Sequence, residues 1–191
     1  MKTTNIMIVG VGGQGTLLAS RILGSALIGE GYDVKLSEVH GMSQRGGSVV
    51  THVKISDDTV NSPLIEKGDA DVILAFEELE AYRWLPYLKE GGTIYMNTQQ
   101  IMPMPVVIGA AEYPADIMGT LSREAGQVKA FDALKIASDC GSVKAVNVVL
   151  LGAASKALPF SEEEWIEVIE KFVKPKFVEL NKKAFAEGRE A

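Results

Sequence analysis

A short apolar run that ends in a glycine-rich loop constrains the fold of this chain more than any other feature. Ile6–Val9 is apolar at every position, as a strand is when helices cover both faces of a parallel sheet. Glycines follow at the spacing G-x-G-x-x-G, and Thr16–Ile28 carries apolar residues at helical intervals. Strand, glycine turn and helix in this order are typical of α/β folds that bind a nucleotide.

The loop between this strand and this helix predicts an anion site. Gly10 suits a tight turn, Gly12 a close approach of backbone to ligand, and Gly15 the packing of helix on strand. Backbone N–H groups and the positive end of the helix dipole meet there, so phosphate is the expected guest. A turn that needs glycines only for packing is the alternative. A Walker-type loop is excluded, because no Lys-Ser or Lys-Thr pair follows Gly15. The candidate cofactor-binding residues of this loop are Gly10, Gly12, Gly13, Gln14 and Gly15.

A second glycine-rich loop follows the next expected strand, Asp33–Val39. The segment from His40 to Ser48 is polar and punctuated by glycines. Arg45 adds one forked cation to flexible backbone donors, a combination that suits phosphate or carboxylate. A solvent-exposed turn is the alternative interpretation. The candidate binding residues here are Ser43, Gln44, Arg45, Gly46, Gly47 and Ser48.

Glu38 keeps a second interpretation of the first loop open. It lies near the end of the expected second strand, at a distance from Gly15 close to the spacing of about 20 residues seen in dinucleotide folds. An acid at this place accepts hydrogen bonds from ribose hydroxyls. An NAD site is therefore compatible with the spacing.

Composition limits the classes of partner. The 191 residues are expected to form a single domain, 1–191, with 47% hydrophobic and 23% charged residues. A formal net charge of −6 argues against a nucleic-acid or anionic-membrane surface, which needs clustered lysine and arginine. We expect neither kind of partner.

The few cysteines and histidines argue against a metal centre on this chain. Cys140 is the one cysteine, so it can form no internal disulfide and cannot alone hold an iron–sulfur cluster or a structural zinc. His40 and His52 have no second ligand at a metal-binding spacing. We assign no catalytic residue. The pattern shows no signal sequence and no apolar run of membrane-spanning length, so a cytoplasmic location is expected.

The remaining segments extend the strand and helix pattern. Ser48–Ile55 alternates as a strand does and is expected to pair as an edge ribbon. Ile101–Pro105 is expected to be an extended connector, on the surface or at a partner interface. Lys144–Leu158 is expected to form one long helix, and Ser161 and Glu164 have the spacing of a capping box.

Two polar features fall at positions that matter for the core. Glu77, Glu78 and Glu80 open a helix, where we interpret them as partners of the helix dipole rather than as an acid/base pair. Asn147 interrupts an apolar helix, so its amide needs partners in the core or at a ligand or subunit interface.

The two loops together resemble a known family. Gly10–Gly15 and Glu38–Ser48 resemble the paired motifs of the gamma domain or subunit of 2-oxoacid:ferredoxin oxidoreductases. The form with His40 is most similar to the small (beta) subunit of indolepyruvate:ferredoxin oxidoreductases. The similarity covers nearly the whole chain and includes Ala145–Gly152, and the run Ser43–Ser48 is its most specific part.

The resemblance implies a division of labour between subunits. A holoenzyme of this family decarboxylates a 2-oxoacid on thiamine diphosphate, passes electrons through iron–sulfur clusters to ferredoxin and releases an acyl-CoA. This chain has too few cysteines for a cluster and no evident Gly-Asp-Gly and Asn pairing for thiamine diphosphate and magnesium. The resemblance therefore implies a non-catalytic subunit that shapes the active-site region, with CoA as a candidate ligand of the glycine loops. Thiamine diphosphate, magnesium and the clusters would belong to a larger partner.

Fold and function are thus predicted as follows. We expect a three-layer, Rossmann-like α/β fold with a mainly parallel sheet, helices on both faces and a helical C-terminal segment, with both loops at the carboxyl ends of the strands. A subunit of a thiamine-dependent oxidoreductase is the first functional hypothesis. A free-standing NAD-dependent dehydrogenase and a nucleotide-binding interaction module are the other two.

Overall fold

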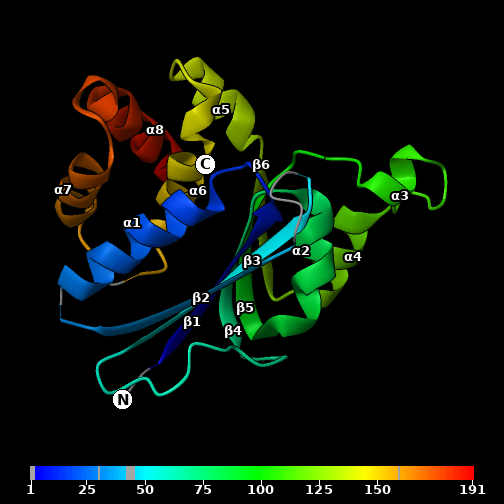
Figure 1. Ribbon diagram of the computed structural model, residues 1–191, viewed down its shortest axis with the longest axis horizontal. Coiled ribbons are helices and arrows are strands. Elements are labelled where there is room, and N and C mark those ends of the chain that lie inside the picture. The colour runs from blue at the N-terminus through cyan, green and yellow to red at the C-terminus, as the bar shows by residue number, and fades with distance from the viewer. Residues whose placement is uncertain (1–2, 30, 42–45, 159) are drawn as a thin grey trace.

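A six-stranded mixed sheet forms the centre of the computed structural model (Figure 1). The structure describes residues 3–29, 31–41, 46–158 and 160–191. The strand order is β2-β3-β1-β4-β5-β6. The strands are β1 (Thr4–Val11), β2 (Asp33–His40), β3 (Ser48–Ser56), β4 (Ala70–Ala75), β5 (Leu88–Asn97) and β6 (Gln127–Phe131).

Three of the strand pairings are parallel and two are antiparallel. β1 pairs with β4, β4 with β5 and β5 with β6 in parallel, whereas β3 runs antiparallel to both β1 and β2. β2 therefore runs in the same direction as β1, and the carboxyl ends of the two strands lie on the same side of the sheet. The predicted α/β class with a mainly parallel sheet is confirmed.

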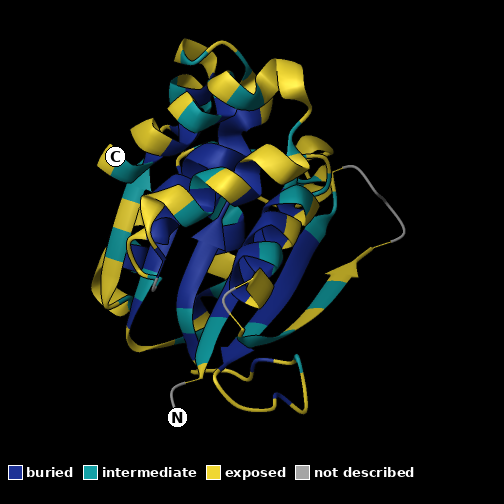
Figure 2. Cartoon of the chain, turned by 90° about the vertical axis from the view of Figure 1, so that its left-hand side faces the viewer, coloured by how far each residue is buried: buried dark blue, intermediate teal, exposed yellow. Residues whose placement is uncertain are grey.

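The expectation that Ser48–Ile55 pairs as an edge ribbon is confirmed, but its polar residues are not exposed. The hairpin of β2 and β3 does lie at the edge of the sheet, but β2 is its outer strand and β3 lies between β2 and β1. Thr51 and His52 are both buried, so the polar residues of the alternating pattern do not mark a solvent face. Figure 2 shows the central strands buried and the outermost strand largely exposed.

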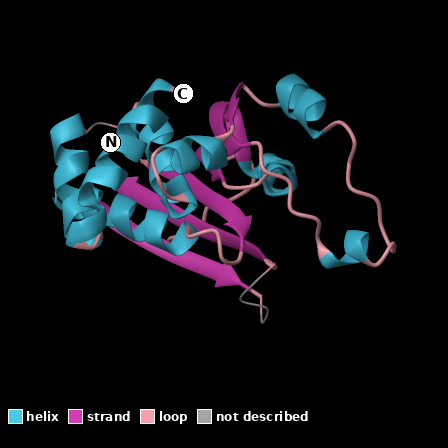
Figure 3. Cartoon of the chain, turned by 90° about the horizontal axis from the view of Figure 1, so that it is seen from above, coloured by secondary structure: helices cyan, strands magenta, loops and turns pink. Residues whose placement is uncertain are grey.

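Helices cover both faces of the sheet, which Figure 3 shows from above. Alternate residues of β1 separate two cores: Ile6 and Ile8 pack with α1 and α6, while Met7 and Val9 pack with α2 and α4. No helix in the described ranges is both long and apolar enough to span a membrane. The helices are α1 (Thr16–Gly29), α2 (Glu78–Trp84), α3 (Met104–Val107), α4 (Ile117–Glu124), α5 (Ala133–Asp139), α6 (Val146–Ser155), α7 (Glu162–Phe172) and α8 (Val178–Glu190).

The C-terminal helices form an outer layer over α6, which is buried at every position. α6 and α8 approach closely at two glycines. A Cβ on Gly152 would overlap the carbonyl oxygen of Phe185, and one on Gly188 would overlap that of Val149. The expected helix Lys144–Leu158 is shorter than predicted, because a 3-10 turn capped by Ser142 precedes α6 and the helix ends at Ser155.

Two local predictions have different outcomes. The capping box at the start of α7 is confirmed: the Glu164 N–H donates to Ser161 Oγ at 3.2 Å, and the Ser161 N–H donates to Glu164 Oε2 at 2.6 Å.

The prediction of an extended connector over Ile101–Pro105 is wrong at the end of that segment. Met104 begins a single helical turn, where Pro105 is tolerated because the first turn needs no N–H donor. Figure 1 shows α3 standing away from the sheet.

Candidate functional site

The two glycine loops meet beyond the carboxyl ends of β1 and β2. The Gly12 N–H donates to the carbonyl oxygen of Gly47 at 2.8 Å, and the Gly46 N–H donates to that of Gly12 at 3.3 Å. Val11 lies opposite Ser48 in the register of β1 and β3, so these bonds continue the ladder beyond the strands. The candidates Ser43, Gln44 and Arg45 lie outside the described residues.

Left-handed backbone at two positions explains why the first loop needs glycine. Gly13 has φ +104° and Gly15 has φ +88°, a region that residues with a Cβ rarely adopt. Gly10 is required for a different reason. It lies within β1, where a Cβ would come within 2.9 Å of the Cβ of Phe76. Gly10 thus allows close packing of β1 on the end of β4.

The first loop presents unused N–H donors. The N–H groups of Gly13, Gly15, Thr16 and Leu17 donate to no other group in the described part of the chain. They lie at the N-terminus of α1, where the helix dipole also favours an anion. Loop and helix start line a cavity of about 440 Å³. This arrangement can bind a phosphate or carboxylate.

Glu38 and His40 of β2 line the same cavity. The Thr51 hydroxyl donates weakly to Glu38 Oε2, at 3.4 Å, which leaves most of the carboxylate free to accept further bonds. The position of Glu38 relative to the glycine loop is the one that its spacing predicts. A carboxylate here can accept hydrogen bonds from ligand hydroxyl groups.

The side chain of Gln14 points inward and fixes the first loop. Gln14 Oε1 accepts from the Val11 N–H at 2.7 Å, and Nε2 donates to the carbonyl oxygen of Phe76 at 2.9 Å and to Gln99 Oε1 at 3.1 Å. Asn97 Nδ2 donates to the same Phe76 carbonyl at 3.1 Å. The side chain of the candidate Gln14 thus positions the loop and does not face the cavity.

A buried acidic group beside the loops was not expected from the sequence. Glu77 is 1% exposed and caps α2, where Oε2 accepts from the Glu80 N–H at 2.9 Å. Its Oε1 accepts from the Ile101 N–H at 3.0 Å and from the Tyr113 hydroxyl at 2.9 Å. Burial raises the pKa of Glu77, and burial beside Glu77 also raises the pKa of Tyr113. Glu77 therefore anchors both ends of the segment that carries α3.

Glu80 connects this group to the second loop. Its Oε2 accepts from the Ser48 hydroxyl at 2.5 Å and from Trp84 Nε1 at 3.3 Å, and its Oε1 pairs with Arg83 Nε at 3.2 Å. The hydroxyl of the candidate Ser48 thus donates its hydrogen bond within the protein, to Glu80. The three glutamates do lie at a helix start, as predicted. The burial of Glu77 depends on partners distant along the chain, such as Tyr113, which is 36 residues away.

His52 is buried and has a structural role. It is 6% exposed, and its Nδ1 accepts from the Ile65 N–H at 3.2 Å. Burial lowers the pKa of its imidazole, so the neutral form is favoured. No group of three or more His, Cys, Asp or Glu side chains in the described ranges could hold a metal ion.

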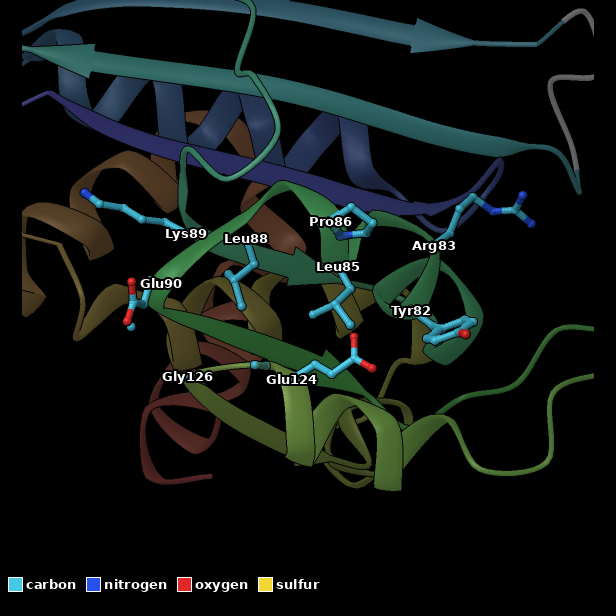
Figure 4. Close-up of a pocket in the computed structure, with 11 residues that line it drawn as sticks. Tyr82, Arg83, Leu85, Pro86, Leu88, Lys89, Glu90, Glu124 and Gly126 are labelled. Atoms are coloured by element: carbon cyan, nitrogen blue, oxygen red, sulfur yellow. The ribbon is translucent and has the colours of Figure 1, made fainter.

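A larger cavity of about 750 Å³ lies at the opposite end of the sheet (Figure 4). Leu85, Leu88 and Glu124 lie around it, near the amino ends of β5 and β6. Open parallel sheets bind their ligands at the carboxyl ends of the strands, where the glycine loops lie. We therefore place the candidate site at the loops.

The comparisons with known proteins define the class. The chain matches the family described as Pyruvate ferredoxin/flavodoxin oxidoreductase over residues 5–191, and it belongs to that family. It is 46% identical to the indolepyruvate oxidoreductase subunit IorB of Thermococcus kodakarensis over 196 residues, covering 100% of this chain and 96% of the relative. The resemblance of the two loop motifs to the gamma-subunit family is thereby confirmed.

Solved structures agree with the fold. The gamma subunit of a keto/oxoacid ferredoxin oxidoreductase from Geobacter sulfurreducens has a TM-score of 0.70 and 29% identity, with 98% of this chain and 96% of that chain covered. A chain of 2-oxoglutarate:ferredoxin oxidoreductase from Magnetococcus marinus, solved with 2-oxoglutarate, coenzyme A and succinyl-CoA, has a TM-score of 0.76. At 19% identity that likeness shows the fold alone, and it covers 100% of this chain and 31% of the other.

Proposed function

We propose that this chain is the small, non-catalytic subunit of an indolepyruvate:ferredoxin oxidoreductase. The observation that carries the proposal is the 46% identity to an IorB subunit along the whole chain. The family match favours this hypothesis over a free-standing NAD-dependent dehydrogenase, although Glu38 lies where such an enzyme needs an acid.

The partner is a larger subunit that carries thiamine diphosphate, magnesium and the iron–sulfur clusters. A cluster needs several thiolates, and the chain contains Cys140 alone. Electrons reach ferredoxin through that partner, in the cytoplasm. The role of this chain is to shape the active-site region and to bind part of a substrate.

CoA is the ligand that the first loop fits. The free N–H groups of Gly13 and Gly15 and the start of α1 offer the donors that a pyrophosphate needs. When bound, CoA supplies the thiol that accepts the acyl group. Gly12 and Gly47 hold the two loops together around this place, and Gln14 keeps the first loop in its conformation. Arg45 is proposed as the cation of the second loop.

Reconstitution tests the proposed function. The chain is purified alone, the larger subunit is purified alone, and the two are mixed. Indolepyruvate-dependent reduction of ferredoxin is then measured with and without CoA. We expect no turnover from this chain alone and CoA-dependent turnover from the mixture. Reduction of NAD by the chain alone would overturn the proposal in favour of a dehydrogenase, and capture of a partner without any turnover would favour an interaction module.

A further inference from the structure

A third cavity adjoins the first turn of α1 at Leu18. Its volume is about 300 Å³, at the lower end of the range of roughly 300–1,000 Å³ typical of small-molecule pockets. Leu18 of α1 forms one wall, and the ends of α6, α7 and α8 form the others. This cavity shares no lining residue with the one that contains Glu38 and His40.

An asparagine with an unpaired amide donor lines this cavity. Asn147 is 3% exposed, and its Oδ1 accepts from the Val148 N–H at 2.9 Å. Its Nδ2 donates to no other group in the described part of the chain, and a Cβ on Gly15 would lie 3.3 Å from it. This amide nitrogen is open to the cavity and can donate to a ligand acceptor. Asn147 is also the polar residue that the sequence pattern singled out within an apolar helix.

Two cations stand at the same cavity without an ion partner. Lys144 and Lys174 line it, and neither forms a salt bridge with any described residue, although the chain carries a net charge of −6. Ion pairs do hold other lysines of the C-terminal layer, such as Lys182 with Glu170. Ser142 adds a hydroxyl to the lining. The polar part of the cavity is therefore rich in donors and free of carboxylates.

Apart from Asn181, the rest of the wall is apolar. Phe172, Val173, Phe177 and Leu180 line it together with Leu18. Phe172 and Phe177 are 39% and 42% exposed, so aromatic side chains stand open at the cavity mouth. A ligand that complements both the donor-rich part and the apolar part of the wall has a negatively charged group and an apolar body.

We propose that this cavity binds a small apolar carboxylate. The amide of Asn147 and the ammonium groups of Lys144 and Lys174 bind the carboxylate, and the aromatic and aliphatic side chains contact the apolar body. The site is independent of the CoA assignment, because it lies outside the cavity of the glycine loops. Asn147 lies next to Gly15 of the first loop, so the two cavities are neighbours.

Titration of the full chain with defined probes tests this site. Phenylacetate and hexanoate are added to the ¹⁵N-labelled protein, and the side-chain amide resonances of Asn147 are followed by NMR. The neutral isosteres phenylacetamide and hexanamide serve as matched ligands, and acetate tests the need for an apolar body. We expect saturable shifts at Asn147 with the two larger carboxylates, and dissociation constants at least tenfold higher for the amides and for acetate.

Exposed lysines provide the variants, since their replacement leaves the core intact. Lys144→Gln combined with Lys174→Gln should raise the dissociation constant for phenylacetate at least tenfold. Lys171→Gln is the control, because Lys171 is exposed on the neighbouring helix but does not line the cavity. Equal binding of amide and carboxylate, an unchanged constant in the double variant, or equal loss in the control would each overturn the proposal. The absence of any shift at Asn147 would overturn it as well.

Discussion

The Tyr113 hydroxyl donates to Glu77 Oε1 at 2.9 Å, across the base of the segment that carries α3. The same carboxylate accepts the N–H groups of Ile101 and Glu80, so one buried acid holds the start of α2 and both ends of that segment. Met104, Val107 and Ile108 of this segment are exposed. Glu77 therefore fixes an apolar surface segment next to the candidate site.

Replacement of Glu77 tests its role as an anchor. Glu77→Ala removes an acceptor from three buried or half-buried donors, and we expect the free energy of unfolding to fall by about 1–3 kcal/mol. Glu77→Gln keeps one acceptor oxygen and should cost less. Urea denaturation measures both, and Glu112→Ala on the same segment is the exposed control. An alanine variant as stable as the control would contradict the anchoring role.

The pH dependence of stability follows from the same residue. Burial raises the pKa of Glu77 above its ordinary value of 4.5, so the folded state holds the proton to higher pH than the unfolded chain does. The penalty for burying the charge is absent below the ordinary value and grows as pH rises from there to the raised pKa. Unfolding free energies between pH 4 and pH 8 should therefore show a decline in the wild type that Glu77→Gln lacks. Parallel profiles for the two proteins would contradict this.

Gly13 tests the first loop with a matched control. Gly13 and Gly68 both have positive φ, +104° and +80° respectively. A Cβ added to either residue would have no other atom within 4 Å. Alanine should thus cost each protein a similar backbone strain of about 1–2 kcal/mol. In the assembled enzyme we expect only Gly13→Ala to raise the KM for CoA, because Gly68 lies in the turn that precedes β4, whereas the glycine loops follow the carboxyl ends of β1 and β2. Equal KM values in the two variants would argue against CoA at this loop.

Gln14 tests whether the loop conformation depends on an internal side chain. Gln14→Leu has a similar volume but leaves the Val11 N–H and the Phe76 carbonyl oxygen without this partner. We expect a loss of about 1–3 kcal/mol in the free energy of unfolding. Gln99→Leu removes the third partner of Gln14 and a long contact from Asn97 Nδ2 at 3.5 Å, and it should cost less. The opposite order in urea denaturation would show that Gln14 is not the residue that fixes the loop.

Much of the fold follows from local pattern, and the exceptions have physical causes. The Asp116 cap of α4 and the α5 helix Ala133–Asp139 follow from capping residues and periodicity. The internal position of β3 does not follow from local pattern. Thr51 and His52 stand between apolar residues, which is typical of a half-exposed strand, and the pattern does not show that β2 pairs with the outer side of β3.

The candidate site shows the same limit. The glycine spacings predicted both loops, and the hydrogen bonds of Gly12 with Gly46 and Gly47 place them together. The inward direction of Gln14 was hidden, since its partners Phe76 and Gln99 lie 62 and 85 residues away along the chain. Burial of Glu77 was hidden for the same reason.

Arg45 provides the most direct measurement of the central claim, that the paired loops of this subunit bind CoA in the assembled enzyme. A charged hydrogen bond contributes about 1.5–3 kcal/mol, so Arg45→Ala should raise the apparent KM for CoA by roughly 10- to 150-fold. Arg45→Lys keeps the charge without the fork and should raise it less. The account predicts this order in a subunit complex that still assembles. Loss of the larger subunit from Arg45→Ala on co-purification, with an unchanged KM for CoA in the complex that remains, would contradict it and would make the second loop an interface element.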